Sequence, residues 1–265
     1  MIRNRVEPKP LPKVRPSHLP GIFGKFEDVV CAAIKSLEAT TEPFNQEKLK
    51  LFRFILARVD TEKYGAMQEI QLADGKLNLA TDIVKYIDPV GWFESKLRAA
   101  LLVGLDKRAP LEILDIGTGP AHFPVIAEFY GHKVLGTDLP YRTTGKLERG
   151  HIYDALAEIY GVRRIPLKVL PFTPLPLLDQ RYDMVTAFLA AFNLDAEKKP
   201  WTTEAWTFFL NDLHRNVLTE NGELFMSLAD EKLTDEVWAF LKAHAVFSND
   251  TSKQIHIIDF SRFGG

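Results

Sequence analysis

The sequence predicts an α/β protein: a doubly wound, mostly parallel, seven-stranded sheet preceded by a helical N-terminal region. Two observations support this prediction. After Pro110, short apolar runs alternate with amphipathic stretches, and continuous apolar strands between helices are typical of a parallel sheet covered on both faces. The chain then closes on two apolar runs, 245–248 and 254–260, separated by a turn-like segment, which predicts a final antiparallel hairpin.

The first part of the chain, up to about residue 108, is predicted to be mainly helical. Apolar residues recur at helical spacing over 25–60, and a further helix is expected over 92–105. Residues 69–80 alternate around an Asp-Gly pair, which favours a short hairpin. The single cysteine, Cys31, falls on the apolar side of the first helical pattern, so we expect a packed core thiol.

Five parallel strands are expected where the apolar runs lie after Pro110. Gly131 and Gly161 follow two of the helical patterns, at positions where a left-handed backbone is needed. The expected helices cover 121–130, 146–160, 203–218 and 234–244. The apolar runs are LEILDI (111–116), KVLGTD (133–138), PLKVL (166–170), YDMVTAF (182–188) and GELFMSL (222–228).

Composition narrows the function classes. Of the 265 residues, 46% are hydrophobic and 26% are charged, which is ordinary for a globular protein. The net charge of −2 gives no overall reason to expect nucleic acid or an anionic membrane as a partner. One cysteine excludes an internal disulfide, and no apolar run approaches the roughly 18 residues of a membrane span. We expect a cytoplasmic protein with no membrane partner and no secretory signal.

The stretch LEILDIGTGPAHF (111–123) lies where an open α/β sheet binds its ligand, at the first strand-to-helix turn. Gly117 and Gly119 allow the backbone to approach a ligand closely, although a tight turn without a ligand explains the same pair equally well. Asp138, at the end of the second strand, favours the ligand because an acid there accepts hydrogen bonds from a ribose diol. Asp115 would repel a pyrophosphate but suits a ligand whose amino acid end is positively charged.

From these residues the chain resembles the class I S-adenosylmethionine-dependent methyltransferases over about residues 92–260. The resemblance rests on LDIGTGPAHF, which is similar to the D-x-G-x-G-x-G loop of that family, and on VLGTD after it. It also rests on LPLLDQRYDMVTAF and LHRNVLTENGELFMSL, which resemble the segments around the fourth and fifth strands. The resemblance implies a Rossmann-like methyltransferase fold and S-adenosylmethionine as the cofactor.

The resemblance also implies roles for individual residues. Asp115 and the backbone of Gly117, Thr118 and Gly119 would face the methionine part of the cofactor, and His122 would touch its carboxylate or face solvent. Asp138 would hold the ribose hydroxyls. Three apolar residues would contact or line the cofactor site, namely Leu139 and Phe172 at the adenine and Phe188 in the cleft.

The chain departs from the family pattern at two places. Ala121 stands where the third glycine of the loop is usual. Pro171 stands where many members carry an acid for the adenine amino group, which leaves Phe172 as the residue to pack on the ring.

No catalytic residue is assigned from the sequence, because methyl transfer from a sulfonium requires alignment rather than a fixed catalytic group. No Cys/His cluster has zinc spacing, and no metal site is expected. Several polar residues are expected near the cleft, where each either contacts the substrate directly or only stabilises its own loop. They are Tyr141, Arg142, Asn193, Asp230 and Glu231. Aromatic residues that would wall an acceptor pocket, or simply pack in the core, are Phe44, Phe54, Tyr64, Tyr86, Trp92 and Trp201.

We expect three segments: a basic, proline-rich arm (1–20), a helical region that covers the substrate (21–108) and an S-adenosylmethionine-binding core (109–265). The favoured function is methyl transfer to an O or N atom of a small molecule. An RNA or protein acceptor and a non-catalytic module that keeps the fold remain as alternatives, since fold alone does not give function. A nicotinamide-dependent dehydrogenase is disfavoured by Asp115 and His122.

Overall fold

The computed structural model describes residues 24–72, 83–139, 152–176, 178–190 and 192–260. Its centre is one seven-stranded sheet in the order β3-β2-β1-β4-β5-β7-β6. The first five strands run parallel, and β7 pairs antiparallel with both β5 and β6. The doubly wound, mostly parallel sheet with a closing hairpin is therefore confirmed. The strands are β1 (Glu112–Ile116), β2 (Lys133–Asp138), β3 (Arg164–Pro166), β4 (Tyr182–Phe188), β5 (Leu218–Ser227), β6 (Phe247–Asn249) and β7 (Gln254–Ile257).

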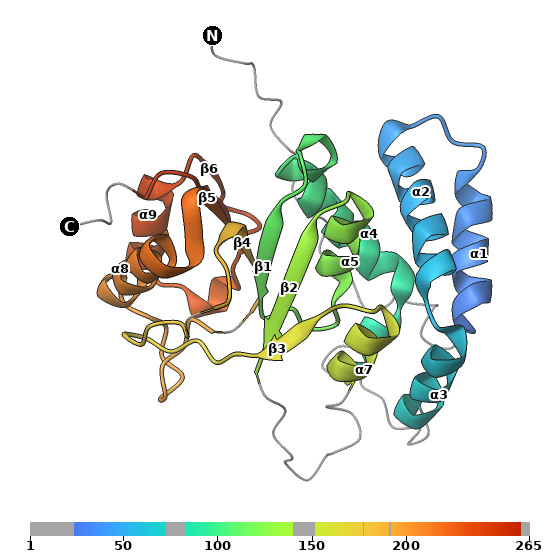
Figure 1. Cartoon of the computed structure of the whole chain (residues 1–265), viewed down its shortest axis with the longest axis horizontal. Helices are drawn as coiled ribbons and strands as arrows, with labels where there is room; N and C mark the ends of the chain where they lie inside the picture. The colour runs from blue at the N-terminus through green and yellow to red at the C-terminus, as the bar shows by residue number, and fades with distance from the viewer. Residues whose placement is uncertain (1–23, 73–82, 140–151, 177, 191, 261–265) are drawn as a thin grey trace.

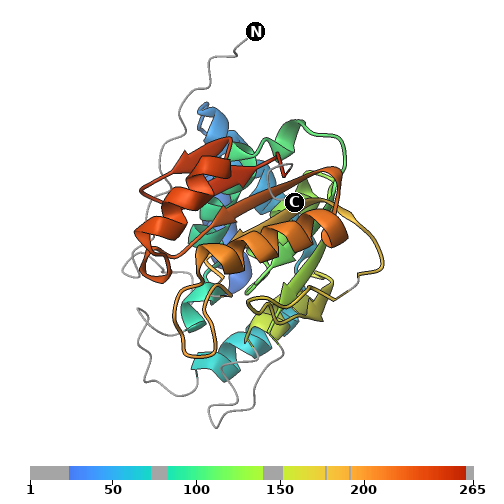
Figure 2. The same cartoon turned by 90° about the vertical axis from the view of Figure 1, so that its left-hand side faces the viewer.

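Helices cover both faces of the sheet, and each face has its own apolar cluster. Figure 1 shows the N-terminal helices and α5 on one side and α8 and α9 on the other, and Figure 2 shows the second side facing the viewer. On the first side lie α1 (Phe26–Leu37), α2 (Pro43–Arg58), α3 (Thr61–Leu72), α4 (Pro89–Leu102), α5 (His122–Phe129) and α7 (Ile152–Ile159), with the short turns η3 (Ile83–Ile87) and η4 (Leu105–Lys107). On the second lie α8 (Thr203–Asp212), its π-helical extension η5 (Leu213–Val217), η6 (Asp230–Lys232) and α9 (Asp235–His244).

The helix α4 brings the N-terminal region to the sheet, and its start is fixed by local sequence. Asp88 accepts hydrogen bonds from the backbone N–H groups of Val90 (2.8 Å) and Gly91 (3.3 Å), and Pro89 occupies the first helical position. A capping carboxylate and a proline at this point are the usual start of a helix. The helix then packs against α5, which follows the glycine loop.

Some expectations were confirmed and others were wrong. Gly131 and Gly161 have positive φ (86° and 65°), as predicted for residues that end helices. The hairpin over 69–80 is wrong for residues 69–72, which belong to α3, and residues 73–80 lie outside the described chain. Of the helix expected over 146–160, residues 146–151 lie outside the described chain, and α7 covers Ile152–Ile159.

The third strand lies earlier than predicted. The apolar run 166–170 suggested the strand, yet pairing with β2 covers only Arg164–Pro166 and ends at the partners Asp138 and Pro166. A proline offers no N–H to a strand ladder. Leu167 still donates its backbone N–H to the Asp138 carbonyl oxygen (2.7 Å), but Leu167 and Val169 are buried beyond the strand as irregular chain, so their apolar character reflects packing.

The expected burial of Cys31 was also wrong, because this thiol is exposed. The buried stripe of α1 consists of Phe26, Val30 and Leu37. Cys31 follows Val30 by one residue, and one helical step turns a side chain by about 100° away from the stripe.

Candidate functional site

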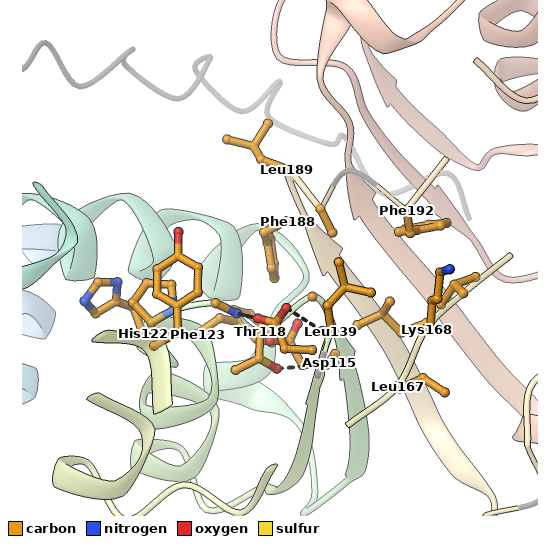
Figure 3. Close-up of a pocket in the computed structure, with 18 of the residues that line it drawn as sticks. Asp115, Thr118, His122, Phe123, Leu139, Leu167, Lys168, Phe188, Leu189 and Phe192 are labelled. Atoms are coloured by element: carbon orange, nitrogen blue, oxygen red, sulfur yellow. Dashed lines mark hydrogen bonds between the residues drawn. The ribbon is translucent and has the colours of Figure 1, made fainter. Parts of the chain in front are cut away.

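A pocket of about 480 Å³ opens at the carboxyl ends of β1, β2 and β4. This is the edge where an open α/β sheet binds its ligands, close to the point at which the strand order reverses between β1 and β4. Figure 3 shows the labelled pocket residues arriving from the loop after β1, the end of β2 and the segments after β3 and β4. Eight of the nine predicted cofactor residues line it: Asp115, Gly117, Thr118, Gly119, His122, Asp138, Leu139 and Phe188.

The two glycines of the loop serve different purposes. Gly117 has φ 69°, and a Cβ there would lie 2.4 Å from the Cβ of Ala190, so only glycine fits between the loop and the segment after β4. Gly119 has φ 55°, and a Cβ there would meet nothing closer than the Gly117 carbonyl oxygen, 3.9 Å away. The backbone at Gly119 therefore borders open space. Ala121, at the third loop position, also has positive φ (63°) and is buried.

The side chain of Thr118 holds the loop against β2. Its hydroxyl donates to the Asp115 carbonyl oxygen (2.9 Å) and accepts the backbone N–H of Thr137 (3.1 Å). Gly136 leaves room for this, because a Cβ at that position would come within 2.7 Å of the Thr118 hydroxyl oxygen. The Thr118 side chain therefore fixes the loop to β1 and β2 through these two hydrogen bonds.

Asp138 connects the loop to the end of β2. Its Oδ2 accepts the backbone N–H of Gly119 and its Oδ1 accepts the backbone N–H of Leu139, both over 2.7 Å. A carboxylate has about four lone-pair sites, so two remain for a ligand. Asp138 is partly buried, and Leu139 beside it is 60% exposed at the edge of the pocket.

Asp115 lies under the loop at 2% exposure. Its Oδ1 accepts the hydroxyl of Thr186 on β4 over 2.6 Å. Burial raises the pKa of Asp115 to about 6, against the opposing effects of the Thr186 hydrogen bond and the ammonium of Lys96. A cation beside this carboxylate would be stabilised by it.

Lys96 enters the same pocket from α4 and was not predicted from the sequence. Its Nζ lies 4.2 Å from the centre of the Phe188 ring, a cation–π distance. Burial lowers the pKa of Lys96 to about 8, and the Asp115 carboxylate opposes this decrease. The pocket floor therefore holds one carboxylate and one ammonium from different parts of the chain.

His122 lines the pocket at its base and is 1% exposed. Its ring lies 4.7 Å from the Phe93 ring and 6.0 Å from the Tyr160 ring, measured between centres. Burial, with a smaller effect of Lys96, lowers the pKa of His122 to about 3, so the imidazole is neutral at physiological pH. In Figure 3 it lies away from Asp115 and Thr118, towards the N-terminal helices.

Phe172 is the predicted residue that the structure does not bring to the pocket. It is 58% exposed with φ 54°, and its ring contacts the edge of Phe208 at a centre-to-centre distance of 6.1 Å. The segment after β3 instead lines the pocket with its preceding residues, Leu167, Lys168, Val169 and Leu170.

Among the aromatic candidates, Tyr86 and Trp92 line the pocket. The Trp92 indole N–H donates to the Lys85 carbonyl oxygen over 2.9 Å, and its ring centre lies 4.6 Å from that of Tyr86. Trp92 is carried by α4, which Figure 1 shows beside the sheet, and Tyr86 by the turn η3 before it. The remaining aromatic candidates pack elsewhere: Phe44, Phe54, Tyr64 and Trp201.

Of the polar candidates that the structure describes, Asn193, Asp230 and Glu231 do not line the pocket. The Asn193 side chain donates to the Lys232 carbonyl oxygen over 2.7 Å, which is the loop-capping interpretation. Asp230 is exposed and pairs with Lys253 at 3.3 Å, and Glu231 is exposed. Tyr141 and Arg142 lie outside the described residues. Among the described residues, no group of three or more His, Cys, Asp or Glu side chains is arranged to hold a metal ion.

Sequence reasoning missed Lys96, Tyr153 and the residues after β4 such as Leu189 and Phe192, all of which line the pocket. A signal for Lys96 existed. It follows Trp92 by four residues, so a helix over this stretch places both side chains on the same face.

No family model and no curated protein matches the sequence. The fold is similar to that of solved structures over part of its length. A ribosomal protein L11 methylase from Lactobacillus delbrueckii subsp. bulgaricus is 19% identical, with 62% of this chain and 77% of that one covered and a TM-score of 0.38. A TehB-like SAM-dependent methyltransferase from Corynebacterium glutamicum is 13% identical (74% and 95% covered, TM-score 0.40), and the CcbJ methyltransferase from Streptomyces caelestis is 19% identical (62% and 57% covered, TM-score 0.37).

These likenesses are distant, and the activity has to be argued from the chain's own site. None of the helices in the described part of the chain combines the length and apolar character that crossing a membrane needs.

Proposed function

We propose that this protein binds S-adenosylmethionine in the pocket and transfers its methyl group to an O or N atom of a small molecule. The observation that supports the cofactor best is the pairing of Asp138 with the open backbone at Gly119. An acid at the end of the second strand, beside a glycine turn after the first, is the arrangement that holds the ribose of a nucleoside ligand in this type of sheet.

The charge beneath the loop supports a ligand with a cationic amino acid end. The Asp115 carboxylate is buried under the loop, where it would repel a pyrophosphate, and its Oδ1 accepts a hydrogen bond from the neutral Thr186 hydroxyl. The pocket volume of about 480 Å³ lies within the range of roughly 300–1,000 Å³ typical of small-ligand sites. The residues present therefore fit this cofactor. Leu139 and Val169 supply apolar surface for a base.

When bound, S-adenosylmethionine supplies an electrophilic methyl group on a sulfonium. The chain's own residues would align the acceptor and exclude water. Tyr86 and Trp92 from the N-terminal region line the pocket, together with Phe188 at the end of β4 and Leu189 and Phe192 after it. No catalytic acid or base is assigned. Within residues 21–108, we propose that η3 and α4 cover the substrate, because their side chains line the pocket.

A small-molecule acceptor is favoured by these apolar and aromatic side chains, because they line a pocket of about 480 Å³, a volume typical of small-ligand sites. RNA, protein or no acceptor at all are the other outcomes of the test. The cytoplasmic location is part of the proposal and is supported by the single cysteine.

Calorimetric titration with S-adenosylmethionine, S-adenosylhomocysteine and NAD tests the cofactor. We expect both sulfur ligands to bind and NAD not to bind. Formation of S-adenosylhomocysteine is then measured with separate pools of small metabolites, RNA and protein. Absence of binding by both sulfur ligands would overturn the proposal, and turnover only with RNA or protein would overturn the acceptor class.

A further inference from the structure

The ammonium of Lys96 is a charged group in the pocket to which the proposed function assigns no role. It is carried by α4, is partly buried, and lies over the Phe188 ring at 4.2 Å. In the described part of the chain it has no hydrogen bond and no carboxylate within 4 Å. A buried cation without a close anion is costly, and a ligand anion would relieve that cost.

The other cations near the pocket are less suited to hold a ligand anion there. Arg164 is already engaged, because its guanidinium donates to the Gly119 carbonyl oxygen (3.3 Å) and pairs with Asp154. Lys168 lines the pocket but is exposed after β3, on the side of Leu167 and Val169. An exposed ammonium is solvated by water and gains little from one more anion.

His122, which the sequence suggested for the cofactor carboxylate, is unsuited to that role. Its ring is enclosed by Phe93 and Tyr160, and as a neutral imidazole it carries no charge to offer an anion. In Figure 3 it lies away from Asp115 and Thr118, where the loop borders the pocket.

The geometry points to Lys96 as the residue that binds the carboxylate of the cofactor's amino acid end, while Asp115 faces the positive charge of the same end. Lys96 on α4 and Asp115 on β1 line the same pocket and interact electrostatically. Together they present a positive and a negative group to the zwitterionic amino acid end of the cofactor. This inference rests on the proposed cofactor. It makes Lys96 a cofactor-binding residue that connects α4 to the ligand.

Two ligands that differ only at the amino acid end provide the test. S-adenosylhomocysteine carries the carboxylate and the ammonium, whereas methylthioadenosine retains the thioether and the nucleoside without them. Both are titrated by calorimetry into the wild type and into Lys96→Met, which keeps the length of the chain and removes its charge. Lys96→Arg is the conservative variant, and Lys35→Met is the control at an exposed lysine of α1, outside the pocket.

We expect Lys96→Met to weaken S-adenosylhomocysteine about 10- to 100-fold, the scale of one charged hydrogen bond, and to change methylthioadenosine by less than about threefold. Lys96→Arg should recover most of the loss, and Lys35→Met should bind both ligands as the wild type does. Thermal unfolding of each variant checks that the fold is retained. If Lys96→Met does not fold, Lys96→Arg and Lys96→Gln carry the comparison.

Equal weakening of both ligands would overturn the inference, because it would mean that Lys96 shapes the pocket without contacting the carboxylate. Unchanged binding of both would also overturn it and would leave Lys96 for an anionic group of the acceptor. In either case the proposed cofactor stands. If the wild type binds neither ligand, the proposed function itself fails.

Discussion

The backbone N–H of Gly119 donates a hydrogen bond of 2.7 Å to Asp138, and this bond joins the turn after β1 to the end of β2. The second oxygen of the same carboxylate accepts the N–H of Leu139. Asp138 therefore has two tasks: it fixes the loop and offers its remaining lone pairs to the ligand. Gly119 has the complementary property, since its missing Cβ leaves the space in which that ligand would lie.

Replacing Asp138 with alanine should weaken S-adenosylhomocysteine by about 1–3 kcal/mol, because ribose hydroxyls lose their acceptor. It should also speed hydrogen exchange at the Gly119 amide, which loses its partner. Asp195→Ala is the control. Asp195 lines the same pocket, but its carboxylate accepts N–H groups of its own loop at Glu197 and Lys199. Equal affinity in Asp138→Ala and the wild type would show that the ribose lies elsewhere.

Gly119→Ala and Gly131→Ala form a matched pair. Both glycines have positive φ (55° and 86°), and an added Cβ would meet no atom closer than 3.9 Å at either. Each variant should lose about 1–2 kcal/mol of unfolding free energy, measured in urea, from the left-handed backbone alone. Only Gly119→Ala should lose cofactor affinity in calorimetry, since its methyl group enters the pocket. Normal binding by Gly119→Ala would remove the loop from the ligand site.

The fold was predictable because its signals are local. Apolar runs that alternate with helices predict a parallel sheet. The positive φ of Gly131 and Gly161 follows from their positions at the ends of two helices. The third strand was misplaced because the run 166–170 is apolar for packing, while pairing depends on which backbone groups face β2. Periodicity does not separate these two causes.

The site was predictable where the chain is contiguous with a strand end. The places of Asp115, Gly119 and Asp138 in the pocket follow from their positions at or just beyond the ends of β1 and β2. Lys96 did not, because its role depends on how α4 packs beside a loop formed about twenty residues later. The position of Phe172 outside the pocket was missed for a related reason: after β3, Val169 lines the pocket and Phe172 does not.

The thiol of Cys31 should react in the native protein. It is exposed on α1, and it is the single cysteine of the chain, so a disulfide-exchange reagent should titrate one thiol per chain without denaturant. The modified protein should bind S-adenosylhomocysteine as before, because no residue of α1 lines the pocket. A thiol that reacts only after unfolding would mean that this face of α1 is covered.

The pH dependence of ligand binding should reveal Lys96 directly. Burial lowers the pKa of Lys96 from 10.5 to about 8, and the titratable groups that face it are the Asp115 carboxylate on β1 and the neutral His122 imidazole on α5. Only the ammonium binds a carboxylate, so the affinity for S-adenosylhomocysteine should fall as the pH rises through about 8, by up to tenfold per unit. Folding responds in the opposite sense. Between about 8 and 10.5 the unfolded chain holds a proton that the folded chain has lost, so this group makes unfolding less favourable as the pH rises.

The variant Lys96→Arg distinguishes the titration of Lys96 from the titration of the ligand. Its guanidinium stays charged throughout this pH range, whereas the ligand's own amino group titrates equally with both proteins. Calorimetry from pH 7 to 10, which is above the pKa of about 6 for Asp115, should therefore show that the affinity for S-adenosylhomocysteine falls more steeply with pH in the wild type than in Lys96→Arg. Parallel curves for the two proteins would mean that the ammonium of Lys96 takes no part in holding the ligand.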